Sequence, residues 1–343
     1  MAVALRALGV LAAVVGACSV HAAEAPQRRI NLLCSVPLAW CEALGASFEK
    51  KTGVKVAVTQ KEGPEALTLL ASQKDAGRFD VWYAGTGEAH QQAADMGLLQ
   101  EYRSPHLSDL RDWGARQASQ AKYRSVGLYM RAMGIIVNTR RLEAKQAPEP
   151  RCLSDLARPE YDDEVHMSHP AQSNAGRTTL LALVQIFGEE KAFELTKRIH
   201  ANVNKYTRRS TNAARAAARG DAMIGVAYMF AIANEVADGF AVRLIVPCEG
   251  VPYDVVAMSL IAKSRNPDGA KLFYDWALTP ESLAIAYKFG YWHMPAHRDA
   301  ELQKPVFNTD QAKLIDLDAN RFTPAERRRI VDRWSREVAG LPR

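Results

Sequence analysis

The feature that most constrains this chain is a repeated alternation of strand-like and helix-like segments along most of its length. Short apolar runs such as 30–34 and the alternating valines of 54–58 are typical of strands. The segments between them carry helix start signals, such as Pro37 in a first turn and Thr86 as a cap. Repeated strand–helix–strand units form a parallel or mixed sheet covered by helices, so the sequence predicts an α/β fold.

The alternation occurs in two series, and the second begins near Arg131. No proline- or glycine-rich linker separates them, which indicates two lobes joined by crossing strands near 126–134 and 252–262. Helix N-termini at strand ends would then face a cleft between the lobes. The expected organisation is a leader over 1–22, lobe 1 over 23–130 and 263–343, and lobe 2 over 131–262. The expected helices include a long one over 267–288 and a basic one after the capping box that begins at Thr323.

The first 22 residues have the layout of an export signal. Arg6 precedes an apolar run over 7–17, and 20–22 (VHA) offers small residues at a cleavage spacing. The run is too short to span a bilayer. Residues 15–18 (VGAC) also resemble a lipoprotein cleavage box, which would leave Cys18 lipidated. The sequence therefore predicts an exported protein, either soluble or anchored by lipid through Cys18.

Four cysteines remain after the leader: Cys34, Cys41, Cys152 and Cys248. In an oxidising compartment, four cysteines indicate two disulfides, for which three connectivities are possible. We favour the local pair Cys34–Cys41 together with the long-range pair Cys152–Cys248. The absence of C-x-x-C spacing argues against metal binding by these cysteines.

The composition is that of a soluble globular protein, with 48% hydrophobic and 24% charged residues, which excludes disordered, collagen-like and coiled-coil classes. The net charge of +6 invites a nucleic-acid interpretation, but no nucleic-acid motif accompanies it. We interpret the arginine run 327–329 as a solvated helix face. No G-x-S-x-G, P-loop, G-x-G-x-x-G or H-E-x-x-H motif supports catalysis, a cofactor or a metal. The histidine pairs His166/His169 and His293/His297 also lack metal-ligand spacing.

Polar turns at three strand-to-helix junctions are the candidate binding elements. They lie at 34–35, 85–87 and 173–176, and Arg177 follows the third. Such turns offer free backbone N–H groups, hydroxyls and the positive end of a helix dipole, which together suit an anion. The candidate ligand-binding residues are Ser35, Thr86, Gly87, Ser173, Asn174, Gly176, Arg177 and Thr178 for the anion, with Tyr228, Glu249 and Tyr253 for the remainder of the ligand.

Several motifs resemble the periplasmic solute-binding proteins of ABC importers. The leader, 80–87 (DVWYAGTG) and 275–281 (DWALTPE) are similar to the iron-type, extracellular family 1 proteins. Within them, 34–35 (CS), 40–42 (WCE), 247–250 (PCEG) and Tyr253 resemble the AfuA-like branch, which includes hexose-phosphate binders. The resemblance implies a type 2 periplasmic binding protein, with two lobes that close on a ligand and hydroxyls and helix N-termini that hold a phosphate.

The chain departs from that branch at two places. It has 173–177 (SNAGR) where the branch commonly reads Ser-x-Ser-Gly-Thr, and 229–231 (MFA) where hexose binders carry His-Asp after a methionine. Loss of polar partners for sugar hydroxyls disfavours a hexose phosphate. The sequence therefore predicts a monomeric, non-enzymatic receptor that closes on a small anionic, phosphorylated or phosphonate-like solute and delivers it to an inner-membrane ABC permease. The alternatives are a ligand sensor that partners a sensor kinase, an exported hydrolase, and a ferric-ion binder; a lone Tyr228 beside Met229 argues against the last.

Overall fold

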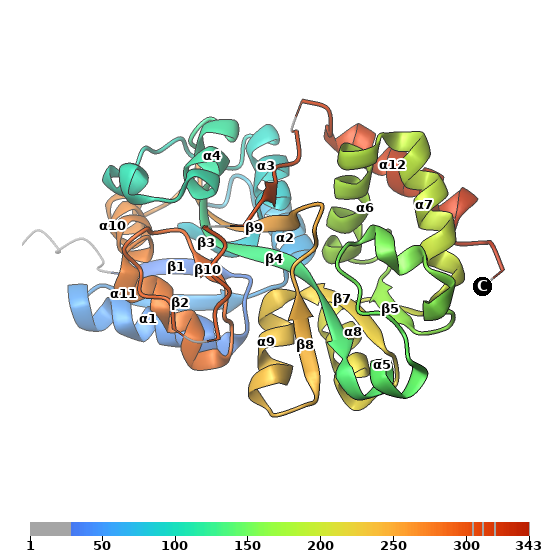
Figure 1. Cartoon of the computed structure of the whole chain (residues 1–343). Helices are drawn as coiled ribbons and strands as arrows, with labels where there is room; N and C mark the ends of the chain where they lie inside the picture. The colour runs from blue at the N-terminus through green and yellow to red at the C-terminus, as the bar shows by residue number, and fades with distance from the viewer. Residues whose placement is uncertain (1–28, 304, 311, 319, 343) are drawn as a thin grey trace, which may run out of the picture.

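The protein consists of two α/β lobes joined by long strands (Figure 1). The computed structural model describes residues 29–303, 305–310, 312–318 and 320–342. The predicted leader, with Cys18, lies outside the described residues. Within them, no helix combines the length and apolar character needed to cross a membrane. The architecture confirms the predicted α/β class and the two lobes connected by crossing strands.

The strands are β1 (Arg29–Cys34), β2 (Lys55–Gln60), β3 (Val81–Thr86), β4 (Val126–Asn138), β5 (Val165–Ser168), β6 (Val203–Thr207), β7 (Ile224–Tyr228), β8 (Val242–Ile245), β9 (Val251–Leu260), β10 (Met294–Pro295) and β11 (Leu314–Ile315). The α-helices are α1 (Leu38–Thr52), α2 (Gly63–Ser72), α3 (Gly87–Asp95), α4 (Asp112–Gln120), α5 (Thr139–Lys145), α6 (Asn174–Phe187), α7 (Glu189–Ala201), α8 (Ser210–Arg219), α9 (Met229–Ala237), α10 (Pro267–Ala277), α11 (Pro280–Leu283) and α12 (Pro324–Glu337). Four short 3-10 helices complete them: η1 (Pro105–Asp109), η2 (Ser154–Ala157), η3 (Pro159–Tyr161) and η4 (Ala284–Phe289).

Strand β4 belongs to the sheets of both lobes. The strand order is β2-β1-β3-β9-β4-β7-β5-β6, with parallel pairing of β1 to β2 and β3, and of β5 to β6 and β7. Residues 126–132 of β4 pair antiparallel with β9, and residues 133–137 pair antiparallel with β7. Strand β9 in turn pairs antiparallel with β3 of lobe 1. These two strands therefore carry the chain between the lobes and form the base of any cleft between them.

The predicted helix over 267–288 is broken in the structure. Helix α10 ends at Ala277, and α11 begins at Pro280 after an N-cap at Thr279. A proline inside a helix removes one hydrogen-bond donor and clashes with the preceding turn. Thr279 supplies a new cap, because its side chain accepts a hydrogen bond from the Ser282 N–H. The prediction of one long helix was therefore wrong at this point.

Each lobe has its own large hydrophobic cluster. One surrounds β1, β3 and α10, with Phe48 and Phe273 in its interior. The other surrounds β5, β7 and α6, and it includes Ile330 and Trp334 of the C-terminal helix α12. Figure 1 likewise shows α12 beside α6 and α7. The expectation that 263–343 belongs wholly to lobe 1 therefore needs correction, since the apolar face of α12 is buried in lobe 2.

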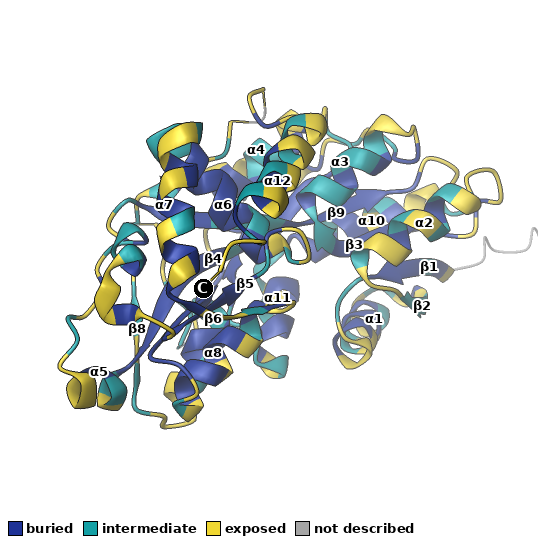
Figure 2. Ribbon diagram, turned by 90° about the vertical axis from the view of Figure 1, so that its right-hand side faces the viewer, coloured by how far each residue is buried: buried dark blue, intermediate teal, exposed yellow. Residues whose placement is uncertain are grey.

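Both predicted disulfides are confirmed: Cys34 with Cys41 and Cys152 with Cys248. The first ties the end of β1 to the first turns of α1, and the second spans 96 residues of lobe 2. Figure 2 shows the strands largely buried and the outer faces of the helices largely exposed. The strand ends and helix N-termini that border the cleft thus extend from a buried framework.

Candidate functional site

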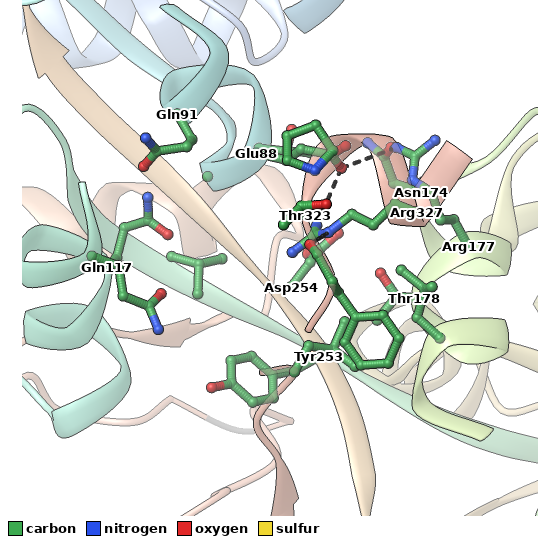
Figure 3. Close-up of a pocket in the computed structure, with 18 of the residues that line it drawn as sticks. Glu88, Gln91, Gln117, Asn174, Arg177, Thr178, Tyr253, Asp254, Thr323 and Arg327 are labelled. Carbon is green, nitrogen blue, oxygen red and sulfur yellow. Dashed lines mark hydrogen bonds and ion pairs between the residues drawn. The ribbon is translucent and has the colours of Figure 1, made fainter. Parts of the chain in front are cut away.

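A cavity of about 380 Å³, lined by charged, polar and apolar side chains, lies between the two lobes, over strand β9 (Figure 3). Lobe 1 contributes α3 and α4, and lobe 2 contributes α6 and the start of α12. The lining residues are Thr86, Gly87, Glu88, Gln91, Asp95, Gln117, Gln120, Asn174, Arg177, Thr178, Leu181, Tyr253, Asp254, Val255, Leu317, Phe322, Thr323, Pro324 and Arg327. We refer to this cavity as the interlobe pocket.

The pocket brings together six of the eleven residues predicted to bind ligand. These are Thr86, Gly87, Asn174, Arg177, Thr178 and Tyr253. The other five do not line it: Ser35, Ser173, Gly176, Tyr228 and Glu249. The residues that meet come from three elements far apart in the sequence, namely the start of α3, the start of α6 and strand β9.

On the lobe 1 side, buried His90 holds the turn that presents Thr86. Its ring stacks on Trp82, and its two nitrogens lie 2.8 Å from the Ala84 carbonyl oxygen and 2.7 Å from Ser259 Oγ. Burial lowers the pKa of His90 to about 4, so the ring is neutral at pH 7. Since a carbonyl only accepts, Nε2 donates to Ala84 and Nδ1 accepts from Ser259. The hydrogen bond from His90 Nε2 supports Ala84 in a left-handed conformation, with φ of 64°.

Thr86 itself caps α3. Its hydroxyl oxygen accepts a hydrogen bond from the Ala89 N–H at 3.2 Å. The next residue, Gly87, faces α4 so closely that a Cβ atom would lie 2.4 Å from Gln117 Oε1. The capping interpretation of Thr86 therefore holds, and the space beside the Gly87 Cα is filled by the Gln117 side chain of α4.

On the lobe 2 side, the start of α6 carries Asn174, Arg177 and Thr178 into the pocket. Gly176 lies behind them, where a Cβ atom would come within 2.4 Å of the Ser168 carbonyl oxygen. The lack of a side chain at Gly176 therefore allows α6 to pack closely on β5, and it does not serve contact with a ligand. Arg177 bonds to the Asn174 side chain and forms an ion pair with Glu88 of lobe 1. The ion pair links the two walls of the pocket.

Arg327 is one of the charged pocket residues that were not predicted from the sequence, together with Glu88 and Asp254. We interpreted 327–329 as a solvated face, but Arg327 lines the pocket and its Nη1 lies 3.6 Å from Glu88 Oε2. Burial lowers the pKa of the Arg327 guanidinium, and Glu88 partly offsets that shift. Its neighbour Arg328 is exposed, and Arg329 binds Glu189 on α7. The capping box at Thr323 was the available signal, because it places a helix N-terminus beside Arg327.

The floor of the pocket contains a partly buried charge cluster on the crossing strands. Asp254 of β9 accepts hydrogen bonds from Arg131 of β4 at 2.6 and 2.7 Å. The Tyr228 hydroxyl donates to the same carboxylate at 2.7 Å. Burial raises the pKa of the Tyr228 hydroxyl well above its usual value, so it stays protonated as a donor. Tyr228 thus lies beneath the pocket, where it orients Asp254.

Tyr253 lines the pocket with its ring, and its hydroxyl bonds to Asp316. Ser35 lies elsewhere: its Oγ accepts a hydrogen bond from Trp82 Nε1 at 2.9 Å. Ser173 precedes α6, and among the described residues its side chain forms no capping hydrogen bond with that helix. Ser35 and Ser173 remain predicted ligand contacts outside the pocket boundary.

The hydrogen bonds of Glu249 within the protein account for the position of its carboxylate without a ligand. Its two carboxylate oxygens accept hydrogen bonds from the backbone N–H groups of Leu153 and Ser154 at 2.9 and 2.8 Å. It therefore caps η2 beside the Cys152–Cys248 disulfide. This turn lies 96 residues away in the sequence, so its proximity was not visible in the local motif.

A histidine–aspartate cluster lies outside the pocket, at His106, Asp109 and His297. Its three potential ligand atoms lie within 4.8 Å of one another. However, His297 Nδ1 accepts a hydrogen bond from the Asp299 N–H at 3.1 Å, so the proton of the neutral ring is on Nε2. His106 Nδ1 bonds to Asp109 at 3.1 Å. The nitrogen of His297 that faces Asp109 is thus a donor, and the geometry favours a hydrogen-bonded cluster over a metal site.

Comparisons with known proteins identify the class to which this site belongs. Residues 79–321 match the family model described as "Bacterial extracellular solute-binding protein". An uncharacterised protein of Haemophilus influenzae is 32% identical over 313 residues, which cover 90% of each chain. The periplasmic binding protein AfuA of Actinobacillus pleuropneumoniae, solved with fructose 6-phosphate bound, is 31% identical with a TM-score of 0.77, covering 91% of this chain and 99% of that one.

A third relative is the phosphoglycerate transport regulatory protein PgtC of Salmonella typhimurium. It is 24% identical over 196 residues, which cover 54% of this chain and 47% of that protein. The chain belongs to the bacterial extracellular solute-binding protein family. It is a periplasmic solute-binding protein of the ABC-transporter type, with the type 2 fold that the motifs predicted.

Proposed function

We propose that the protein binds a small anionic solute, phosphorylated or phosphonate-like, in the interlobe pocket and delivers it unchanged to an inner-membrane ABC permease. The observation that carries the proposal is the pairing of Arg177 and Arg327 on one wall. Both guanidiniums lie near helix N-termini, at the starts of α6 and α12. Arginine forks and helix N-termini are the donors that proteins use for phosphoryl groups.

The relatives support this class of ligand. AfuA is described with bound fructose 6-phosphate, and PgtC is named for phosphoglycerate transport. We nevertheless propose a ligand other than a hexose phosphate, because the chain has Phe230 and Ala231 where the resemblance places the His-Asp pair of hexose binders. Phe230 itself borders a small neighbouring cavity rather than the interlobe pocket. Its ring packs against Tyr228 and His293, with centroids 5.9 and 4.5 Å away. An apolar ring at this place cannot replace hydrogen bonds to sugar hydroxyls.

The proposed mechanism is closure of the lobes without a covalent step. A ligand that contacts α3 on one side and α6 and α12 on the other stabilises the closed state over the open one. Strands β4 and β9 connect the lobes and absorb the change. The permease then recognises the closed receptor, which acts as a monomer.

A thermal-shift screen tests the ligand class. The panel contains phosphorylated sugars, 3-phosphoglycerate, phosphonates, inorganic phosphate, carboxylates, ferric iron and neutral sugars. A ligand at one hundred times its Kd stabilises the folded protein by about 2.7 kcal/mol. We expect anions from the phosphorylated set to raise the melting temperature. A neutral solute that does so while no anion does would overturn the proposal.

Two arginine variants test the site. We expect Arg177→Ala to weaken binding of the best anion at least tenfold, because the pocket loses a guanidinium. Arg328→Ala removes the same charge from an exposed position of α12 and should leave binding unchanged. Equal effects of the two variants would argue against the interlobe pocket as the binding site.

A sensing role is the second candidate, and the regulatory name of PgtC favours it. In that case the closed protein docks onto a sensor kinase. Deletion of the gene separates the two roles. If the protein is a transport receptor, its loss abolishes ligand uptake. If it is a sensor, its loss abolishes only the transcriptional response to the ligand. Ferric binding is less favoured, since Tyr253 is the one tyrosine among the residues that line the pocket and its hydroxyl already bonds to Asp316.

A further inference from the structure

The carboxylate of Glu88 lies between the two arginines of the interlobe pocket. Its Oε2 atom is 3.3 Å from Arg177 Nη2 and 3.6 Å from Arg327 Nη1. Glu88 belongs to the first turn of α3 in lobe 1, whereas both arginines belong to lobe 2. A single oxygen therefore bridges two guanidiniums across the cleft, as the dashed lines in Figure 3 show.

This bridge satisfies the arginines incompletely. Charge-assisted N–H···O bonds are usually about 2.7–2.9 Å long, and both contacts of Glu88 exceed that range. One carboxylate also brings one negative charge to two positive ones. A phosphoryl group carries three oxygens and up to about two negative charges, so it can contact both guanidiniums at once.

The other carboxylates that line the pocket do not supply the missing charge. Asp254 is held by Arg131 and Tyr228 in the floor. Asp95 lies about two turns further along α3 than Glu88. Its carboxylate accepts a hydrogen bond from the Gln91 side chain. The lobe 2 wall thus presents a local excess of positive charge that faces Glu88 alone.

We infer that the anionic group of the ligand binds where the Glu88 carboxylate lies, and that Glu88 occupies this subsite in the ligand-free protein. This inference rests on the proposed function. Glu88 is then an internal competitor that a bound anion must displace from Arg177 and Arg327. It also joins the lobes before the ligand arrives, so only anions that bind the arginines better than a carboxylate complete the closed state.

The first experiment measures affinity by calorimetry, with inorganic phosphate and 3-phosphoglycerate as probes in low-chloride buffer. Glu88→Gln keeps the shape of the side chain and removes its charge. Because the competitor is lost, we expect binding to tighten roughly three- to tenfold. Arg327→Gln should weaken binding of the same probes at least tenfold, whereas Arg328→Gln, on the exposed side of the same helix, should not. Unchanged or weaker binding by Glu88→Gln would overturn the inference.

The second experiment measures the ligand-free shape by small-angle X-ray scattering. We expect Glu88→Gln to have a larger radius of gyration than the wild type, since the interlobe bridge is gone. Glu62→Gln is the matched control, because Glu62 also pairs with an arginine of lobe 2, Arg209, at 3.4 Å, but both side chains are about 70% exposed. An unchanged radius for Glu88→Gln would refute the bridging role.

The two experiments separate the inference from the proposed function. If neither the wild type nor any variant binds an anion in calorimetry or in the thermal-shift panel, the proposed function fails. The scattering comparison still decides whether Glu88 joins the lobes. If the wild type binds anions and Glu88→Gln binds them no better, the function stands and the assignment of Glu88 to the subsite is refuted.

Discussion

The partly buried charge cluster in the pocket floor predicts a large loss of stability when its central carboxylate is neutralised. Asp254 accepts three hydrogen bonds, two from Arg131 and one from Tyr228, at 2.6–2.7 Å. The side chains of Asp254 and Arg131 are 14% and 22% exposed. Asp254→Asn keeps the volume but removes the charge, so Arg131 is left buried without its counter-ion.

Removal of one partner from a buried ion pair costs about 3–5 kcal/mol, because the remaining charge stays desolvated. The Tyr228 ring, whose centroid is 4.9 Å from the guanidinium carbon, offsets a small part of this cost through a cation–π contact. We therefore expect the free energy of unfolding to fall by about 3 kcal/mol or more. An exposed pair provides the control: Glu281→Gln, which breaks the contact with Lys51 at side-chain exposures of 58% and 52%, should cost about 1 kcal/mol or less.

Urea denaturation followed by circular dichroism and by tryptophan fluorescence measures both variants. Two probes are needed because two lobes can unfold separately, which would invalidate a single free energy. A double mutant completes the test. In Arg131→Met with Asp254→Asn no unpaired charge remains, so it should be more stable than Asp254→Asn alone. A loss below 1 kcal/mol, or strictly additive effects, would refute the account of the floor as a coupled ion pair.

Further predictions concern the disulfides, pH and packing. Cys152→Ser removes a cross-link that spans 96 residues, and by chain entropy it should lower the free energy of unfolding by up to about 4.7 kcal/mol. Cys34→Ser removes a cross-link that spans 7 residues and should lower it by about 2.4 kcal/mol. Equal losses of the two variants in urea titrations would contradict the loop-length argument. Burial lowers the pKa of His90 to about 4, below the value near 6.5 of an unfolded histidine, so its contribution to stability is complete above about pH 6.5 and is lost as the pH falls towards 4. His90→Gln should flatten this part of the stability profile, and an unchanged slope would exclude His90 as its source. Gly176→Ala should destabilise lobe 2 by about 1–3 kcal/mol in thermal unfolding, because its Cβ would meet the Ser168 carbonyl; wild-type stability would show that α6 can move away.

Local patterns were sufficient for most of the secondary structure. The strand ranges follow from short apolar runs, and Thr86 was recognised as a helix cap from its position alone. The failure at 267–288 came from a helix-compatible stretch that contains Thr279 and Pro280, where a break and a new cap replaced one continuous helix. The two disulfides of the structure are the pairing favoured among the three connectivities that four cysteines allow.

The candidate site was predicted in part, and the division follows the range of the interactions. Asn174 and Arg177 were predicted because a polar turn before a helix can be recognised from neighbouring residues alone. In the folded protein the same turn begins α6, and both residues line the pocket. Arg327 was missed, and Glu249 was assigned to a ligand although it caps a turn 96 residues away. The capping box at Thr323 marks a helix start beside Arg327 but not the wall that the helix faces, and Glu249 has the sequence neighbourhood of an ordinary loop glutamate.

The sequence by itself predicted the class of this protein: an α/β chain with two lobes, two disulfides, polar helix starts that suit an anion and an expected export leader. The strands, helix starts and leader follow from patterns a few residues long, and the number of disulfides follows from the count of cysteines. Only the tertiary structure decided which charges meet. Helix α12 packs on lobe 2 through Ile330 and Trp334, which brings Arg327 beside Arg177 and opposite Glu88. Contacts over such separations depend on the packing of whole helices, and no local pattern encodes them.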